Sequence, residues 1–193
     1  MQKFSGWTAL GVIAVSLVIS KYLATSNFFH PDQPLLLASE NSRDFLTNPK
    51  PISSNFPKQP TKLTTTLEQE VYEQINEYRL SHHLPPLVLD ARISEQARTH
   101  SQAMASGQVP FSSQGFDLRS DAISKVMPYQ KICENVAYNF GHPDPARAAV
   151  NSWLRNSEGS VVDVTGEYEL TGIGVATNIK GEYYFTQIFI RRQ

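Results

Sequence analysis

The sequence predicts an α+β fold in which one sheet lies between two layers of helices, a three-layer α-β-α sandwich. Three segments between residues 67 and 154 repeat apolar side chains at helical spacing. The chain then changes to two segments, 170–177 and 182–190, that are rich in β-branched and aromatic residues. Both alternating faces of the second segment carry apolar groups, so we expect helices on both sides of the sheet.

The first helix is predicted to start at Thr66. Thr66-Leu-Glu-Gln69 has the pattern of a capping box, and Pro85 and Pro86 mark the break that follows the helix. Between these points, apolar side chains recur every three or four residues, as on one face of a helix. That face consists of Leu67, Val71, Ile75 and Tyr78.

Two further helices are marked by their first residues. Asp90 is a favoured N-cap, and Gly107 supplies a stop for the helix that Asp90 begins. Asp144-Pro145 opens the other helix, because proline suits the first helical position. A shorter helical turn is expected at residues 121–126. The apolar faces contain Ile93, Ala97, Ser101 and Met104 in one helix, and Ala146, Ala149, Val150, Trp153 and Leu154 in the other.

The C-terminal segments are predicted to form a β-hairpin, because residues 178–181 between them supply a turn. Gly172 and Gly174 lie inside the first strand and are followed by another strand. A dinucleotide-binding loop needs a helix there, so these glycines are expected to permit the close approach of another backbone. Trp153 and Tyr183-Tyr-Phe185 are expected in the core, and a pocket for a lipid or glycan is the alternative role for these aromatic residues.

The N-terminus predicts export. Lys3 precedes an apolar run at residues 7–20, the arrangement of a charged region followed by an apolar region. Residues 1–26 are either a cleaved signal peptide or a retained membrane anchor over residues 4–24. Residues 27–66 are rich in Pro, Ser and Asn, which predicts a disordered tether. Residues 67–193 then form the folded domain, outside the cytoplasm.

Net charge and cysteine content limit the partners and the covalent links that this chain can have. The 193-residue chain has a net charge of -1, which gives no electrostatic reason to expect a nucleic acid partner. Cys133 is the only cysteine, so no intramolecular disulfide can form. Because Cys133 lies in an apolar run, we expect its thiol to be buried and inert.

Five short strings occur in a fixed order, and together they resemble the CAP superfamily, which includes cysteine-rich secretory proteins, antigen 5 and pathogenesis-related 1. The resemblance covers residues 67–190. It implies an α-β-α sandwich with a C-terminal hairpin in the sheet, and a concave pocket whose histidines and glutamates can bind a divalent metal. The strings are Pro110-Phe-Ser-Ser-Gln-Gly-Phe-Asp117, Glu134-Asn-Val-Ala-Tyr-Asn139, Ser157-Glu-Gly-Ser160, Thr171-Gly-Ile-Gly-Val-Ala176 and Tyr183-Tyr-Phe-Thr-Gln-Ile-Phe189.

The chain departs from the family at the metal-binding positions. Ser113 and Ser160 stand where the bacterial pattern has histidine, and Tyr184 stands where eukaryotic branches have one. A zinc site needs three or four donors and favours imidazole, so we expect no metal and no other cofactor. Two carboxylates, Glu134 and Glu158, would at most suit a weak hard cation. The candidate pocket residues are Ser113, Glu134, Asn135, His142, Ser160 and Tyr184, with His142 as a substitute ligand.

Glu134 has two interpretations. As a structural residue it is a hydrogen-bonded pin that ties its loop to Ser113, Asn135 or a backbone amide. As a functional residue it is a general acid or base on the pocket floor. We favour the pin, because acid–base work requires a second titratable group and the family's histidines are replaced. His100 is expected at the edge of the core, and His82 and His83 in solvent.

The sequence therefore predicts an exported, non-enzymatic CAP-domain protein. Its expected partners are a lipid, glycan or other cell-envelope ligand, with the membrane contacted through the N-terminal segment. One alternative is a cell-envelope hydrolase that uses Glu134 as acid or base. The other is a structural interaction module of an envelope assembly.

Overall fold

The structure is a computed structural model that describes residues 13–17, 60–156 and 160–193. Its sheet has the strand order β1-β3-β5-β4-β2, in which only β2 and β4 pair in parallel. The strands are β1 (Ile13–Leu17), β2 (Val88–Leu89), β3 (Tyr129–Phe140), β4 (Leu170–Thr177) and β5 (Glu182–Arg192). The helices are α2 (Lys62–Ser81), α3 (Ala91–Ala105), α4 (Phe116–Ser124), α5 (Pro145–Arg155) and α6 (Ser160–Thr165).

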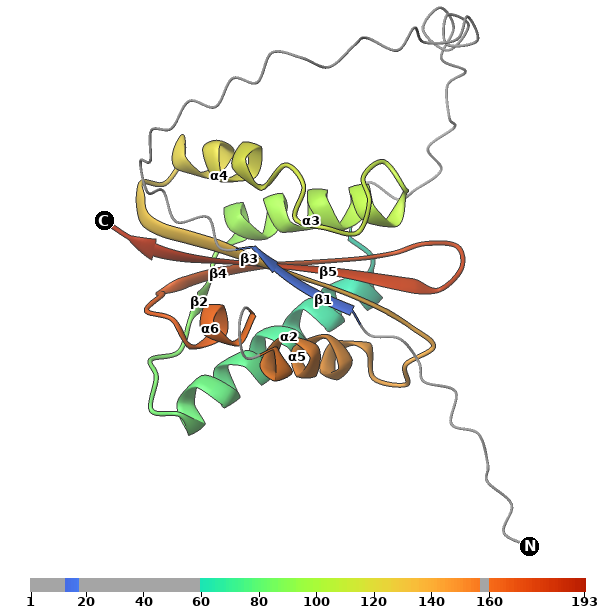
Figure 1. Ribbon diagram of the computed structural model, residues 1–193, viewed down its shortest axis with the longest axis horizontal. Coiled ribbons are helices and arrows are strands. Elements are labelled where there is room, and N and C mark those ends of the chain that lie inside the picture. The colour runs from blue at the N-terminus through green and yellow to red at the C-terminus, as the bar shows by residue number, and fades with distance from the viewer. Residues whose placement is uncertain (1–12, 18–59, 157–159) are drawn as a thin grey trace, which may run out of the picture. The chain divides into compact units, whose positions relative to one another are not determined.

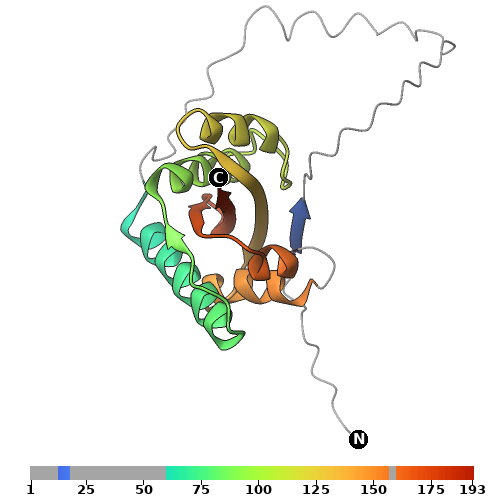
Figure 2. The same cartoon turned by 90° about the vertical axis from the view of Figure 1, so that its left-hand side faces the viewer.

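Helices cover both faces of this sheet, as Figures 1 and 2 show. On one face, α3 and α4 bury a cluster that includes Ile93 and Ile123 against Ile188 and Ile190 of β5. On the other face, α2, α5 and α6 bury a larger cluster, which takes Phe185 and Phe189 from the same strand. The predicted three-layer α-β-α sandwich and the hairpin in its sheet are therefore confirmed.

Helix α3 lies directly against β4 at the two glycines. A Cβ on Gly172 would lie 2.3 Å from the backbone N of Ser94, and one on Gly174 would lie 2.1 Å from the backbone N of Arg98. No side chain larger than hydrogen fits at such distances. The prediction that these glycines allow a close backbone approach is confirmed.

Two helices begin where their caps predict, and two begin elsewhere. The Asp90 carboxylate accepts from the backbone N–H groups of α3, and the Asp144 carboxylate does the same for α5. Helix α2 begins at Lys62, before the predicted start, because the Thr61 side chain accepts from the N–H of Thr64. Residues 62–66, predicted as tether, are therefore helical. Helix α4 begins at Phe116, where the prediction was residues 121–126.

The segment around Glu134 was predicted as a loop, and this prediction was wrong. It is a strand, β3, paired with β5 along most of its length, with Glu134 opposite Ile188. Residues 132–137 are all buried, since helices cover both faces of the sheet. The polar–apolar alternation that marks a half-exposed strand is therefore missing from its sequence.

Part of the predicted leader or anchor is extended. Ile13–Leu17 forms β1 and pairs with the outer edge of β3, with Leu17 opposite Glu134 and Ile13 opposite Tyr138. The other residues of the predicted leader, and the predicted tether up to residue 59, lie outside the described residues. Among the helices that the structure describes, none is long and apolar enough to cross a bilayer. Export and anchoring therefore stay predictions.

Candidate functional site

A buried ion pair occupies the centre of the candidate site. Arg119 donates from Nε to Oε2 of Glu134 at 2.8 Å and from Nη2 to Oε1 at 2.6 Å. This is a bidentate, charge-assisted pair in which both carboxylate oxygens are engaged. The Glu134 side chain has no exposed surface.

Arg119 also ties the neighbouring loop to the sheet. Its Nη1 donates to the carbonyl of Gln114 at 3.0 Å, and its Nη2 lies 3.4 Å from the carbonyl of Ser113. Gly115 makes this turn possible, because its φ of 75° lies in the left-handed region that favours glycine. Helix α4 then starts at the next residue and brings Arg119 back over Glu134. The guanidinium thus acts as a pin for the whole loop.

His100 lies beside this pair and is neutral. Its Nε2 donates to the carbonyl of Ser112 at 2.8 Å, which requires the tautomer with the proton on Nε2. Burial lowers the pKa of His100 to about 4, and the positive charge of Arg119 acts in the same direction. The imidazole therefore carries no charge at neutral pH. Its Nε2 lies 4.0 Å from Oε1 of Glu134, beyond hydrogen-bonding distance.

Opposing effects act on the Glu134 carboxyl. Burial raises its pKa above the usual value, and the hydrogen bonds and charge of Arg119 oppose that shift. Ser113 lies close enough for its hydroxyl to lower the pKa as well, although the two groups do not reach hydrogen-bond geometry. Glu134 is therefore a buried carboxyl whose partners belong to the protein itself.

The alternation of side chains along β3 divides the other candidate residues between the two faces of the sheet. Ser113 lies with Glu134 on the α3 and α4 side. Asn135 points to the opposite side, where its Nδ2 donates to the backbone carbonyl of Ser160 at 3.1 Å. Both Asn135 and Ser160 are fully buried. In the part of the chain that the structure describes, no group of three or more His, Cys, Asp or Glu residues is placed to hold a metal ion. Glu158 lies outside that part.

His142 and Tyr184 lie away from Glu134. His142 lines a groove between α2 and the start of α5, together with Leu67 and Tyr183. Tyr184 packs on Tyr138, with ring centroids 5.2 Å apart, near the hairpin turn. No described contact joins either residue to Glu134. The prediction of one pocket containing all six residues is therefore not met by the contacts in the structure.

Arg119 is the residue that sequence reasoning missed. Arg119 follows Ser113 by six positions, just after the string 110–117 that the resemblance had singled out. It is also a cation 15 residues before Glu134, a carboxylate that was expected to lie in apolar surroundings. A buried carboxylate needs a partner, so this pairing could have been inferred.

Other predicted roles agree in part. His100 is buried at the core edge, burial raises the pKa of the Cys133 thiol, and Trp153 and Phe185 lie in the core. Tyr183 and Tyr184, also predicted in the core, are only half-buried.

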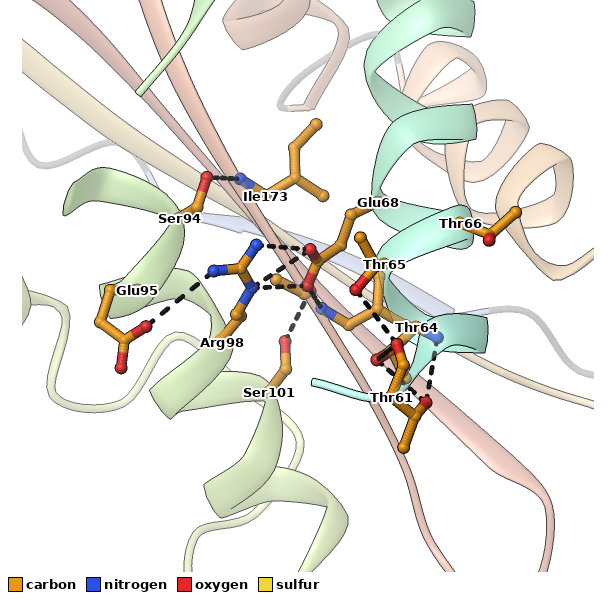
Figure 3. A network of polar contacts seen from close by, with 12 residues as sticks. Thr61, Thr64, Thr65, Thr66, Glu68, Ser94, Glu95, Arg98, Ser101 and Ile173 are labelled. Atoms are coloured by element: carbon orange, nitrogen blue, oxygen red, sulfur yellow. Dashed lines mark hydrogen bonds and ion pairs between the residues drawn. The ribbon is translucent and has the colours of Figure 1, made fainter. Parts of the chain in front are cut away.

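A second buried ion pair holds the layers together at another place (Figure 3). Arg98 of α3 donates from Nε and Nη2 to the carboxylate of Glu68 in α2, at 2.9 and 2.7 Å. Glu68 also accepts from the backbone N–H of Val175 in β4 at 3.2 Å. This pair joins two helices and a strand. Its charged groups are engaged with one another, as those of Glu134 and Arg119 are.

The arrangement around Glu134 suits neither zinc binding nor proton transfer. Zinc needs three or four deprotonated donors, and here a carboxylate already carries a guanidinium on both oxygens. A general acid or base must come within hydrogen-bonding reach of a substrate, and Glu134 has no exposed surface. The groups nearby are hydroxyls, a neutral imidazole and Arg119.

A family model and a curated protein both match this chain. The cysteine-rich secretory protein family (CAP) matches residues 72–189. An uncharacterized membrane protein, YlbC of Bacillus subtilis (strain 168), is 32% identical over 154 residues, which is 78% of this chain and 41% of that protein. The chain therefore spans less than half the length of this curated relative.

Solved structures agree with this assignment. An extracellular protein with an SCP domain from Bacillus anthracis has a TM-score of 0.54 and 27% identity over 71% of this chain and 45% of its own. An outer surface protein from Borrelia burgdorferi, at 16% identity, shares the fold with a TM-score of 0.56 over 66% of this chain and 94% of its own. These relatives are membrane, extracellular or outer-surface proteins. The chain belongs to the cysteine-rich secretory protein (CAP) family.

Proposed function

We propose that this chain is an exported CAP-domain protein that works outside the cytoplasm as a non-enzymatic binding module. Its ligand is a lipid, a glycan or another component of the cell envelope. The observation that carries the proposal is the bidentate pair between Arg119 and Glu134. This pair supports a structural role for Glu134, the acidic residue that matches the family pattern.

The pair argues against catalysis by geometry and by energy. A catalytic carboxyl must exchange a proton with substrate or water, and both oxygens of Glu134 already accept from Arg119. Freeing one oxygen would leave a buried guanidinium partly unpaired, which is costly. A binding site therefore forms more easily on the surface of this domain than in its buried interior.

A cell-envelope hydrolase is the second candidate, and one observation favours it. His100 and Glu134 are two titratable groups 4.0 Å apart, and burial raises the pKa of Glu134 while it lowers that of His100 to about 4. Catalytic acid and base pairs also have pKa values pushed apart. Two observations weigh against a hydrolase: both side chains are buried, and His100 already donates to the carbonyl of Ser112.

Two observations support a location outside the cytoplasm. The apolar run at residues 7–20 is preceded by Lys3, as in exported proteins, and the relatives are membrane, extracellular or outer-surface proteins. The domain is either secreted or held at the membrane by residues 4–24, and the second arrangement requires residues 13–17 to leave their pairing with β3. The mass of the mature chain distinguishes cleavage near Ser26 from a retained anchor.

The test uses purified peptidoglycan and phospholipid vesicles as probes. The protein is incubated with each, and both the sedimented protein and the soluble fragments released from the probe are measured. We expect sedimentation with at least one probe and no released fragments. Glu134→Gln, checked for a folded state, should bind as well as the natural chain. Fragments that are released by the natural chain and lost in folded Glu134→Gln would establish the hydrolase.

A further inference from the structure

The turn between β4 and β5 carries an isoleucine that is almost fully exposed. Ile179 has 95% of its surface accessible, in a position where turns usually place polar residues. Hydrogen bonds close this turn: Oδ1 of Asn178 accepts from the backbone N–H of Lys180 at 3.0 Å and of Glu182 at 3.2 Å. The N–H of Gly181 also donates to the Asn178 carbonyl at 3.0 Å. Ile179 therefore extends outward from a hydrogen-bonded turn.

Aromatic side chains surround the base of this turn. Phe140, at the end of β3, lies opposite Glu182 and is 49% exposed. The Tyr138 ring packs on the Tyr184 ring at 5.2 Å and on the Phe111 ring at 6.0 Å. All three of these rings are half-buried. We call Phe111, Tyr138, Phe140, Ile179, Lys180 and Tyr184 the hairpin-end surface.

The polar atoms of this surface are already satisfied within the protein. The Tyr138 and Tyr184 hydroxyls donate to the Glu182 carboxylate at 3.1 and 3.3 Å, and Asn178 donates to it as well. The Asn178 hydrogen bond lowers the pKa of Glu182, so this carboxylate stays charged and paired. Apart from the charged end of Lys180, what this surface presents outward is apolar: ring surface, Phe140 and Ile179.

The N-terminal part of the chain meets the domain at this same end. Pro60 and Thr61, where the described domain begins, line a groove with Val175–Thr177, the last residues before the turn. Ile13, the first residue of β1, lies opposite Tyr138. The described part of the apolar run therefore begins at the end of the domain that carries Ile179.

We propose that the hairpin-end surface docks on a phospholipid bilayer, with Ile179 inserted at the boundary between headgroups and acyl chains. Tyrosine rings are favoured at this depth, because they combine an apolar body with a polar tip. Lys180, next to Ile179, is the cation of this surface, and it offsets the charge of Glu182 where anionic headgroups approach. This proposal rests on the location outside the cytoplasm that is given under Proposed function, for a domain that meets a bilayer there.

A bilayer fits these observations better than a glycan does. A glycan is held by hydrogen bonds as well as by stacking, and the tyrosine hydroxyls already donate to Glu182. Ile179 and Phe140 have no polar side-chain atom to offer. An exposed aliphatic side chain gains free energy when it leaves water for the acyl chains of a bilayer, and a glycan offers it no such apolar medium.

The test places an environment-sensitive fluorophore on the full chain, as Ile179→Cys and separately as Leu118→Cys. Leu118 on α4 is the matched control, since it is apolar and 71% exposed but lies away from the turn. Cys133 is buried and burial raises its thiol pKa, so the unlabelled natural chain checks that it does not react. The carrier is a vesicle of phosphatidylethanolamine and phosphatidylglycerol. The probe reports local environment, so anchoring through the N-terminus affects both labels equally.

We expect the label at position 179 to shift to shorter wavelength and to be quenched by spin-labelled lipids, while the label at position 118 stays in water. Lys180→Glu should reduce the quenching at position 179 several-fold. Equal aqueous exposure of both labels would overturn the proposal. Protection of position 179 by soluble peptidoglycan fragments but not by vesicles would overturn it in favour of a glycan site. Released fragments in the hydrolysis assay would refute the proposed function and leave these fluorescence results unchanged.

Discussion

Arg119 and Glu134 lie 15 residues apart in the chain, and their side chains meet in a bidentate contact of 2.6 and 2.8 Å beneath the surface of the domain. The resemblance to the CAP family implies a divalent cation beside this carboxylate. The structure has a guanidinium there. This permanent charge is supplied by the chain itself, and it engages both oxygens through which Glu134 would bind a cation.

The stability of the domain should fall in acid because of His100. A histidine whose folded pKa is lowered binds fewer protons in the folded state, so unfolding takes up a proton and acid favours it. The contribution is fully present above the unfolded pKa of 6.5 and is lost as the pH falls to about 4. This shift corresponds to about 3 kcal/mol. Chemical denaturation at both ends of this range measures the loss.

His100→Gln is the matched variant for this pH dependence, since an amide can still donate to the Ser112 carbonyl. It should remove most of the loss between pH 6.5 and 4. Exposed His82→Gln should leave the loss unchanged. Glu134 acts with the opposite sign, because a raised carboxyl pKa favours the folded state in acid. If His100→Gln and His82→Gln have equal pH profiles, the burial effect on His100 is wrong.

Gly172→Ala and Gly174→Ala should each destabilise the domain by about 3 kcal/mol or more, because the added methyl meets the backbone of α3 rather than a flexible side chain. Gly107→Ala is the control: nothing lies within 4 Å of its Cβ, and only its φ of 73° opposes the substitution. That control should lose about 1–2 kcal/mol. Thermal and denaturant unfolding measure the loss of stability in the three variants. Equal losses in all three would show that the close approach of α3 to β4 does not cause the destabilisation.

Arg79 should prove as important as any apolar core residue. It is 1% exposed and donates to the carbonyls of Pro85, Val164 and Gly166, at 2.9, 2.6 and 3.0 Å, which ties the end of α2 to the segment before β4. Arg79→Met leaves these buried acceptors without donors and should cost about 3 kcal/mol or more. Exposed Arg155→Met should change the free energy of unfolding by less than about 0.5 kcal/mol. A similar effect of both variants would contradict this role.

The natural chain should bind no zinc tightly. Ser160 lies on the opposite side of the sheet from Glu134, so only Ser113→His adds an imidazole beside this carboxylate. With Arg119 still on both oxygens of Glu134, that single change should not create a site. We therefore expect zinc affinity to appear only in Ser113→His with Arg119→Met, where Glu134, His100 and the new imidazole are free to act as donors, with proton release on binding. Calorimetry compares the natural chain, the single variant and this double variant. Micromolar binding by the natural chain would show that other residues complete a site.

Local sequence patterns predicted the elements that depend on neighbouring residues. Asp90 and Asp144 cap the helices that they were expected to cap, and the alternation in β5 identified a sheet covered on both faces. The start of α2 was misplaced, because Thr61 and Thr66 both precede apolar spacing and only Thr61 accepts from the helix N–H groups. Capping patterns alone do not choose between two such threonines.

Contacts between distant residues could not be predicted in this way. Arg79 and Val164 are 85 residues apart, and nothing in the local sequence of either one indicates the other. Strand β3 was missed because burial on both faces removes its alternation. The pairing of Glu134 with Arg119 is the exception, since a buried carboxylate needs a cationic partner, but its bidentate geometry depends on the turn at Gly115.

A double-mutant cycle on Glu134 and Arg119 tests the central claim most directly. For a structural pair, Glu134→Gln and Arg119→Met should each lower the free energy of unfolding by ~3–5 kcal/mol, and the double variant should lose clearly less than their sum. Functional residues often behave in the opposite way, since removing a strained catalytic group stabilises the fold. A Glu134→Gln variant that is more stable than the natural chain would therefore contradict the structural role of Glu134.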